Sequence, residues 1–191
     1  MIHNRMAIKE EGLLGRAILY CSLILCFASP EQIIGQSKPM VNLDLGIVVD
    51  VIAPGDKAPM PLVLTGAEKS PVAKLSIDVG FSSKLLSFVE AARAEGLEGT
   101  KADVKTEMRD GEGEEKVLRV DIMSPEPISS GKLLTLVFEV SKGLEEDEQQ
   151  IAVRSLRRSG QAADGQELEV LGVDGSITVL KPLPACFFYM H

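Results

Sequence analysis

The stretch VNLDLGIVVDV, residues 41–51, decides the fold class, because apolar and polar side chains alternate along most of it. A period of two is typical of a β-strand with one buried face, since successive side chains of a strand point to opposite sides of the sheet. The apolar residues that follow this period are Val41, Leu43, Leu45, Ile47, Val49 and Val51. The stretch therefore predicts one unbroken strand. Gly46 lies inside it and predicts a bulge or a close approach of another backbone.

Similar apolar runs recur along the rest of the chain, separated by glycines, prolines and acidic turns such as PGD at 54–56. The runs lie at 62–64, 75–81, 118–122, 134–140, 151–153, 168–170 and 177–179. About nine short strands of this kind predict an all-β fold, namely an antiparallel β-sandwich. The one helix that we expect is a short segment over residues 87–96, where Val89, Ala92 and Arg93 are at helical spacing.

The N-terminal segment has the features of an export signal. Arg5, Lys9 and Arg16 precede the apolar run AILYCSLILCFA, residues 17–28, whose length suits a signal peptide and is short for a membrane span. We therefore expect a signal peptide over residues 1–28, with a retained N-terminal membrane anchor as the alternative. An exported protein of this kind is extracellular, at the cell surface or periplasmic.

The rest of the chain divides into three parts. Residues 29–40 predict a spacer rich in proline, glutamine and serine, residues 41–181 the β-sandwich domain, and residues 182–191 a tail whose role stays open. Of the three cysteines only Cys186 lies outside the signal peptide, so the mature chain is expected to have no intramolecular disulfide.

The charge distribution excludes nucleic acid as a partner. The net charge is −8, and the chain has no basic stripe that would displace counterions from a phosphate backbone. The short cluster Arg154, Arg157 and Arg158 is flanked by acidic loops, and we interpret it as a solvated strand end. A membrane contact is expected only through an uncleaved N-terminal segment.

Catalytic machinery is missing from the predicted domain. The two histidines are His3, within the signal peptide, and His191 in the tail, so neither a histidine-activated nucleophile nor a histidine zinc site is expected. Phosphate-binding and dinucleotide-binding glycine motifs are also absent. Paired carboxylates stay open as a formal alternative, although the acidic residues lie in loops or alternate outward on strands. We predict a non-catalytic protein with no catalytic residue, no metal site and no cofactor.

Two loops, residues 110–115 and 145–148, are strongly acidic. They lack the ligand spacing of an EF-hand calcium loop. We interpret both as solvated hairpin loops.

Three segments of the chain resemble one known family. The segment IDVGFSSKLLSFV, residues 77–89, is similar to a signature in which a strand ends in Tyr-Asp-Pro and apolar residues follow. Phe81 stands at the Tyr position, and Ser82 and Ser83 depart from the Asp and Pro. The segments 120–140 and 164–179 are similar to the later strands of the same family. In this order and spacing, residues 41–180 resemble the bacterial cohesin domains.

The resemblance implies a nine-stranded jelly-roll sandwich that binds a dockerin-like protein through one sheet face. The motif residues themselves are expected to pack in the core: Phe81, Leu86, Phe88, Leu136 and Phe138. The candidate binding residues are the polar ones predicted to point outward from a flat face: Ser76, Asp78, Arg119, Asp121, Thr135 and Glu139. The same residues are also what any solvated sheet face displays.

Two further functions stay open at this point. The jelly-roll fold is shared with carbohydrate-binding modules, so a polysaccharide is the alternative partner. Sugar faces are usually gripped by Trp and Tyr, and Tyr189 is the only such residue beyond the signal peptide, which disfavours this hypothesis. The second alternative is a structural module of an envelope or secretion assembly.

Overall fold

The computed structural model describes residues 38–144 and 148–180, and these residues form an all-β domain. The strands are β1 (Met40–Leu45), β2 (Ile47–Ile52), β3 (Lys57–Thr65), β4 (Val72–Ser82), β5 (Leu86–Arg93), β6 (Asp103–Asp110), β7 (Glu115–Ile128), β8 (Gly131–Val140), β9 (Glu148–Ala162), β10 (Glu167–Leu171) and β11 (Gly175–Leu180). The predicted fold class is therefore confirmed. The predicted signal peptide, most of the spacer and the tail lie outside the described residues.

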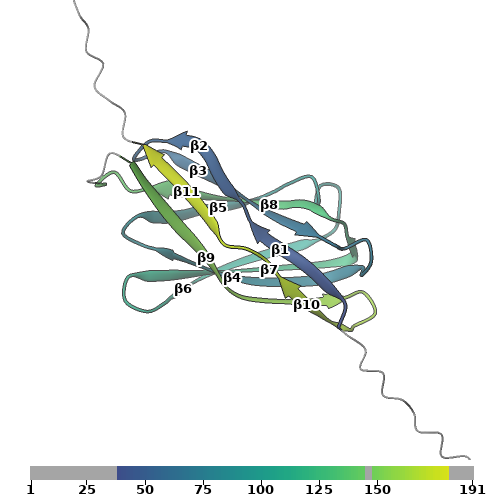
Figure 1. Ribbon diagram of the computed structural model, residues 1–191. Coiled ribbons are helices and arrows are strands. Elements are labelled where there is room, and N and C mark those ends of the chain that lie inside the picture. Colours follow the sequence, from purple (N-terminus) through teal and green to yellow (C-terminus); the bar gives the residue numbers. More distant parts are fainter. Residues whose placement is uncertain (1–37, 145–147, 181–191) are drawn as a thin grey trace, which may run out of the picture. The chain divides into compact units, whose positions relative to one another are not determined.

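The strands form two packed layers that are joined along one side (Figure 1). Hydrogen bonds connect them in the order β5-β8-β3-β1-β10-β9-β4-β7-β6. The path passes from one layer to the other at β10, which pairs parallel with β1 and antiparallel with β9. β11 makes a second connection, parallel to β2 and antiparallel to β9. The result is a mostly antiparallel jelly-roll sandwich, as expected, whose outermost strands are β5 and β6.

Gly46 breaks the first predicted strand into β1 and β2. Leu45 before it is buried, whereas Ile47 is 64% exposed and Val48 is buried, so the inward parity reverses at this point. The Gly46 N–H donates a hydrogen bond to the Pro61 carbonyl at 2.8 Å, and a Cβ on Gly46 would lie 2.4 Å from Cγ of Pro61. The predicted close approach is confirmed, but the predicted unbroken stripe over residues 41–51 is wrong.

The predicted helix over residues 87–96 is also wrong. Most of this segment is strand β5, which pairs antiparallel with β8. The register shifts between Phe88 and Glu90, so Val89 is an extra residue that interrupts the period of two. This bulge hid the strand pattern, because residues on either side of it no longer alternate in phase.

Strand β6 was not predicted from the sequence. It is an edge strand that pairs only with β7, and all of its residues except Val104 are exposed. An edge strand with two solvated faces has no apolar stripe to reveal it.

An aromatic cluster joins the two layers of the core. Phe138 of β8 makes edge contacts with Phe81 of β4 and Phe88 of β5, with ring centroids 5.1 and 5.9 Å apart. Phe81 and Phe138 are buried, as are Leu86 and Leu136, and Phe88 packs against them while partly buried. The five predicted packing residues are therefore confirmed as parts of the core. Among the described residues, no helix is long and apolar enough to cross a membrane.

Candidate binding surface

The outward side chains of β9, β4, β7 and β6 form a polar face, which we call the docking face. Register places Arg157, Asp78, Arg119 and Glu107 side by side in one row across the four strands. The neighbouring row contains Ser159, Ser76, Asp121 and Lys105. In the first row the charges alternate between positive and negative, an arrangement that stabilises directly opposed side chains of a sheet.

The docking face is more basic than the chain as a whole. Its basic residues are Lys74, Lys105, Arg109, Arg119, Arg154 and Arg157, and its acidic residues are Asp78, Asp103, Glu107, Glu115 and Asp121. Basic residues are thus in slight excess here, whereas the whole chain has a net charge of −8. The excess makes this face a favourable surface for acidic groups of a partner.

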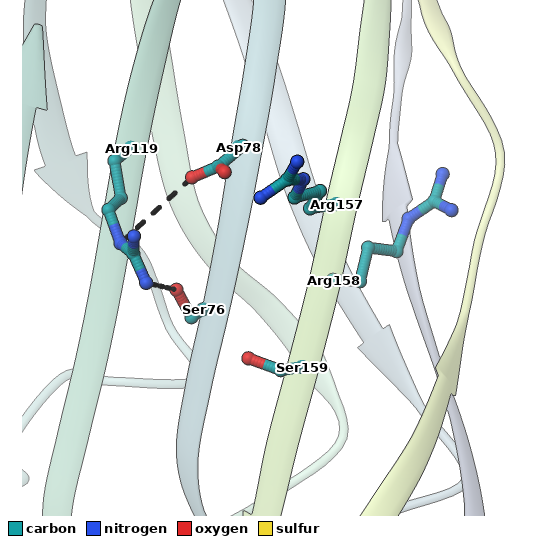
Figure 2. A pocket seen from close by; sticks show the side chains of 6 residues that line it. All are labelled: Ser76, Asp78, Arg119, Arg157, Arg158 and Ser159. Carbon is teal, nitrogen blue, oxygen red and sulfur yellow. Dashed lines mark hydrogen bonds and ion pairs between the residues drawn. The ribbon is translucent and has the colours of Figure 1, made fainter. Parts of the chain in front are cut away.

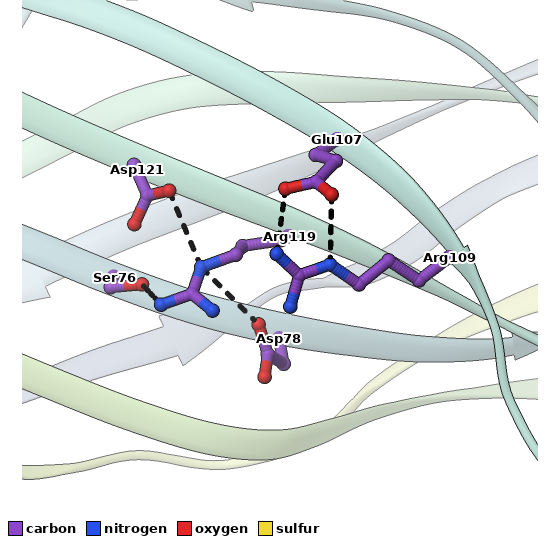
Figure 3. A network of polar contacts seen from close by, with 6 residues as sticks. All are labelled: Ser76, Asp78, Glu107, Arg109, Arg119 and Asp121. Carbon is purple, nitrogen blue, oxygen red and sulfur yellow. Dashed lines mark hydrogen bonds and ion pairs between the residues drawn. The ribbon is translucent and has the colours of Figure 1, made fainter.

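Arg119 is the centre of a polar network on β7 and β4 (Figure 3). Its Nε lies 3.3 Å from Oδ2 of Asp121 and 4.0 Å from Oδ1 of Asp78, and its Nη2 donates to Oγ of Ser76 at 3.4 Å. Two carboxylates therefore share the charge of one half-buried guanidinium.

A second ion pair lies on the edge strand. Arg109 donates two hydrogen bonds to Glu107, from Nε to Oε1 at 3.0 Å and from Nη2 to Oε2 at 2.6 Å (Figure 3). The hydrogen bond from Arg109 holds the pKa of the Glu107 carboxyl below its ordinary value. Both side chains are well exposed, so solvent screens this pair and its contribution to stability is small.

A hollow of about 320 Å³ opens on the docking face between β7, β4 and β9 (Figure 2). It is lined by Ser76, Asp78, Arg119, Arg157, Arg158 and Ser159. Arg157 points toward Asp78, whereas Arg158 extends away from it, with Nη2 3.9 Å from Oδ1 of Asp174.

Two residues that line the hollow have a buried polar atom without a hydrogen-bond partner among the described residues, namely Asp78 at Oδ1 and Arg158 at Nε. Oδ1 of Asp78 is buried and accepts no hydrogen bond from the described residues. Arg157 forms no ion pair within the described part of the chain. A buried carboxylate oxygen gains from a donor, so the hollow offers a hydrogen-bond acceptor at Asp78 Oδ1.

The structure brings together four of the six predicted binding residues. Ser76, Asp78, Arg119 and Asp121 lie on the docking face, as neighbours on β4 and β7. Ser76 is only 7% exposed, although it was expected on an exposed face, because it lies beneath the Arg119 guanidinium that it contacts.

The other two predicted residues lie on the opposite side of the sandwich. Thr135 and Glu139 of β8 are cross-strand neighbours of Pro61 and Lys57 of β3. The expectation of a single face that contains all six residues is therefore wrong, because β8 and β4 belong to different layers.

Sequence reasoning missed part of the docking face. Lys105, Glu107 and Arg109 alternate along β6, and this charged period of two was the available signal for the strand. Arg157 was assigned to a solvated strand end, but it lies within β9 opposite Asp78.

The acidic segment 110–115 is the turn between β6 and β7, as predicted, with Glu112 and Glu114 exposed. Its carboxylates form ion pairs with nearby cations: Asp110 with Lys116, Glu114 with Lys84, and Glu115 with Arg154. The described residues contain no group of three or more His, Cys, Asp or Glu side chains placed to hold a metal ion. Residues 145–147 of the second acidic loop lie outside the described residues.

The fold and its polar outer face define a β-sandwich recognition module. The sequence matches the model of the cohesin domain over residues 41–179. The chain belongs to the cohesin domain family, and the resemblance noted in the sequence is confirmed. Cohesin domains are non-catalytic binding modules.

Solved structures share the fold at low sequence identity. The third cohesin of ScaC from Acetivibrio cellulolyticus, solved in complex with the ScaB dockerin, has 19% identity, a TM-score of 0.62, and coverage of 74% of this chain and 99% of that one. A type I cohesin in the OlpA complex with a dockerin from Clostridium thermocellum has 19% identity, a TM-score of 0.58 and coverage of 74% and 99%.

An archaeal structure is similar as well. The non-cellulosomal cohesin of Archaeoglobus fulgidus has 14% identity, a TM-score of 0.55 and coverage of 74% of this chain and 92% of that one. No curated protein sequence matches this chain.

Proposed function

We propose that this cohesin domain binds a dockerin-type protein through the docking face. The observation that carries the proposal is the buried Asp78 Oδ1, which faces a hollow and accepts no hydrogen bond from the described residues. A buried polar atom without a partner costs about 1–3 kcal/mol. A partner that inserts a hydroxyl or amino donor into the hollow recovers this energy on binding.

The family and its complexes give the class of partner. Cohesins from Acetivibrio cellulolyticus and Clostridium thermocellum were solved with dockerins bound. At 19% identity these structures support the shared fold alone, and the docking face supplies the independent argument from charge and unmet hydrogen bonding.

The surface chemistry favours a protein over a polysaccharide. The outward residues of the docking face within the described part of the chain include no Phe, Tyr or Trp. Sugar rings stack on aromatic faces, whereas protein partners are recognised by charged rows and by exposed apolar side chains such as Leu156.

We further propose that the domain acts outside the cytoplasm, after removal of residues 1–28. The composition of the N-terminal segment supports export, and cohesin domains are typical of extracellular scaffolds. Intact-mass analysis of the protein recovered from its own cells tests this proposal. A mature chain that starts close to residue 29 is the expected result, and a full-length cytoplasmic chain would overturn it.

The binding proposal is tested with a panel of purified dockerins that includes those of the two bacterial complexes above. We expect at least one dockerin to bind, and we expect Asp78→Ala to weaken it by about tenfold or more. Glu139→Ala, on the other side of the sandwich, is the matched control and should leave affinity unchanged.

Three results would contradict the proposal. The first is that no dockerin in the panel binds. The second is that Asp78→Ala and Glu139→Ala bind equally well. The third is that the protein is instead retarded on polysaccharide gels, which would favour the carbohydrate-binding alternative.

A further inference from the structure

Strand β9 contains one residue more than its neighbour β4 requires. Asp78 is paired with Arg157, but the next residue, Val79, is paired with Ser155, so Leu156 has no opposite residue. Such a bulge resets the alternation of a strand, and bulges are enriched where a side chain must be re-aimed next to a functional site. Here the bulge lies beside the hollow of the docking face.

The bulge brings Leu156 to the outer surface. Leu156 is 42% exposed, and it lies above Gly80 of β4: a Cβ built on Gly80 would be 3.0 Å from Cδ1 of Leu156. Val117, the neighbour of Gly80 on β7, is half-buried on the same face. Leu156 and Val117 thus lie on either side of Gly80 at the margin of the charged rows, and the Glu115 carboxylate also lies over Gly80.

The next residue, Arg157, also faces outward and points into the hollow (Figure 2). Arg119 already shares its charge with Asp78 and Asp121, whereas Arg157 forms no ion pair within the described residues. The hydroxyl groups of Ser76 and Ser159 line the same hollow. The hollow is lined by three guanidinium groups and one carboxylate, that of Asp78, so a carboxylate that enters from outside beside Arg157 and Ser159 meets a net positive lining.

We propose that this bulge is the specificity element of the docking face. Leu156 contacts an apolar side chain of the protein partner, and Arg157 pairs with a carboxylate from a neighbouring position of that partner. The inference rests on the proposed function, because it names the chemistry that the same face recognises. A regular strand would direct only one of these two consecutive side chains outward.

The test is a selection from a library of dockerins in which surface positions are randomised. The library is selected in parallel on the wild-type protein, on Arg157→Glu, and on a variant that lacks Leu156. The deletion removes the extra residue and keeps the pairing on both sides of it. Leu156→Ser is the second variant if the deletion fails to fold, and circular dichroism checks every variant.

We expect the wild type to enrich dockerins with Asp or Glu next to an apolar residue. Arg157→Glu should enrich Lys or Arg at the same position, and a dockerin chosen on the wild type should bind it at least about tenfold more weakly. The deletion, or Leu156→Ser, should lose the preference for the apolar residue.

The outcomes separate the two proposals. If the wild type enriches no dockerin, the proposed function fails and this inference fails with it. If the wild type enriches dockerins without an acidic preference, or Arg157→Glu enriches the same sequences, the inference is overturned while the proposed function stands. Binding of an acidic polysaccharide that Arg157→Glu abolishes would overturn both.

Discussion

The two outer faces of the sandwich share one core but differ in chemistry. The docking face has alternating charges, a hollow and the β9 bulge. The other outer face, formed by β5, β8, β3 and β1, we call the opposite face. Its central residues are small or apolar: Pro59, Pro61, Val63, Thr135 and Val137. The core requires only the inward residues to be apolar, so the outward residues of the two layers can differ in chemistry.

The prolines of β3 illustrate the difference. The Pro61 carbonyl faces Gly46, and β3 pairs with β1 only from Leu62 onward. Up to Pro61, the edge of β3 that faces Gly46 therefore has no ladder partner. No ladder hydrogen bond is lost there because the prolines lack an N–H. The charged groups on this face include Lys57 and Glu139, which are neighbours near one end, and Asp44 and Glu90, which lie opposite Val63 and Val137.

The largest effect is expected from a substitution in the core, which both faces share. Phe138→Ala deletes the ring that contacts Phe81 and Phe88, and it should lower the free energy of unfolding by about 3–5 kcal/mol. Its neighbour Val137 lies half-buried on the opposite face, and Val137→Ala should cost about 1 kcal/mol. Urea denaturation measures both values. Equal losses would show that the aromatic cluster does not join the layers.

The next effect concerns the seam between the layers. A Cβ on Gly172, between β10 and β11, would lie 2.0 Å from the Leu43 carbonyl oxygen, and a backbone atom cannot move away easily. Gly172→Ala should cost about 1–3 kcal/mol of folding stability. Gly143→Ala is the control, because its Cβ would meet only Oγ of Ser141 at 4.0 Å. Similar melting temperatures for the two variants would refute the close contact.

A smaller effect distinguishes the faces directly. Arg119→Met leaves Asp78 and Asp121 without their shared cation, and it should destabilise the protein by about 1 kcal/mol, because the guanidinium is half-exposed and partly screened. Lys57→Met on the opposite face should change the stability by less than about 0.5 kcal/mol. Thermal unfolding at low and high salt measures the difference, which should shrink as salt rises. A salt-independent difference would contradict an electrostatic origin.

The smallest effect is a pH dependence at Glu107. Arg109 lowers the pKa of this carboxyl in the folded protein, so the pair contributes stability above the ordinary Glu pKa, near 4.3, and loses it as the pH falls through the folded value. Melting temperatures at pH 6 and pH 3 should therefore converge between the wild type and Glu107→Gln as the pH falls. A difference in melting temperature that is the same at pH 6 and at pH 3 would contradict this origin.

Much of the fold was predictable because a strand shows its period locally. Alternation along 75–81, 118–122 and 134–140 identified β4, β7 and β8 and the inward Phe81 and Phe138. The same parity identified Asp78, Arg119 and Asp121 as outward residues. The order and spacing of the segments 77–89, 120–140 and 164–179 supported the resemblance to the cohesin family, which is confirmed.

Register, and the bulges at Val89 and Leu156, were decided by the tertiary structure alone. The phase reversal at Gly46 and the extra residues Val89 and Leu156 arise from hydrogen bonding with strands that are distant in the sequence. Such pairing also decided that Arg157 lies opposite Asp78, while Thr135 and Glu139 lie in the other layer. The sequence alone determined which side of a strand is apolar, because the alternation of apolar and polar side chains is visible in consecutive residues. Which polar residues meet on one face depends on how strands align, and only the folded chain specifies that alignment.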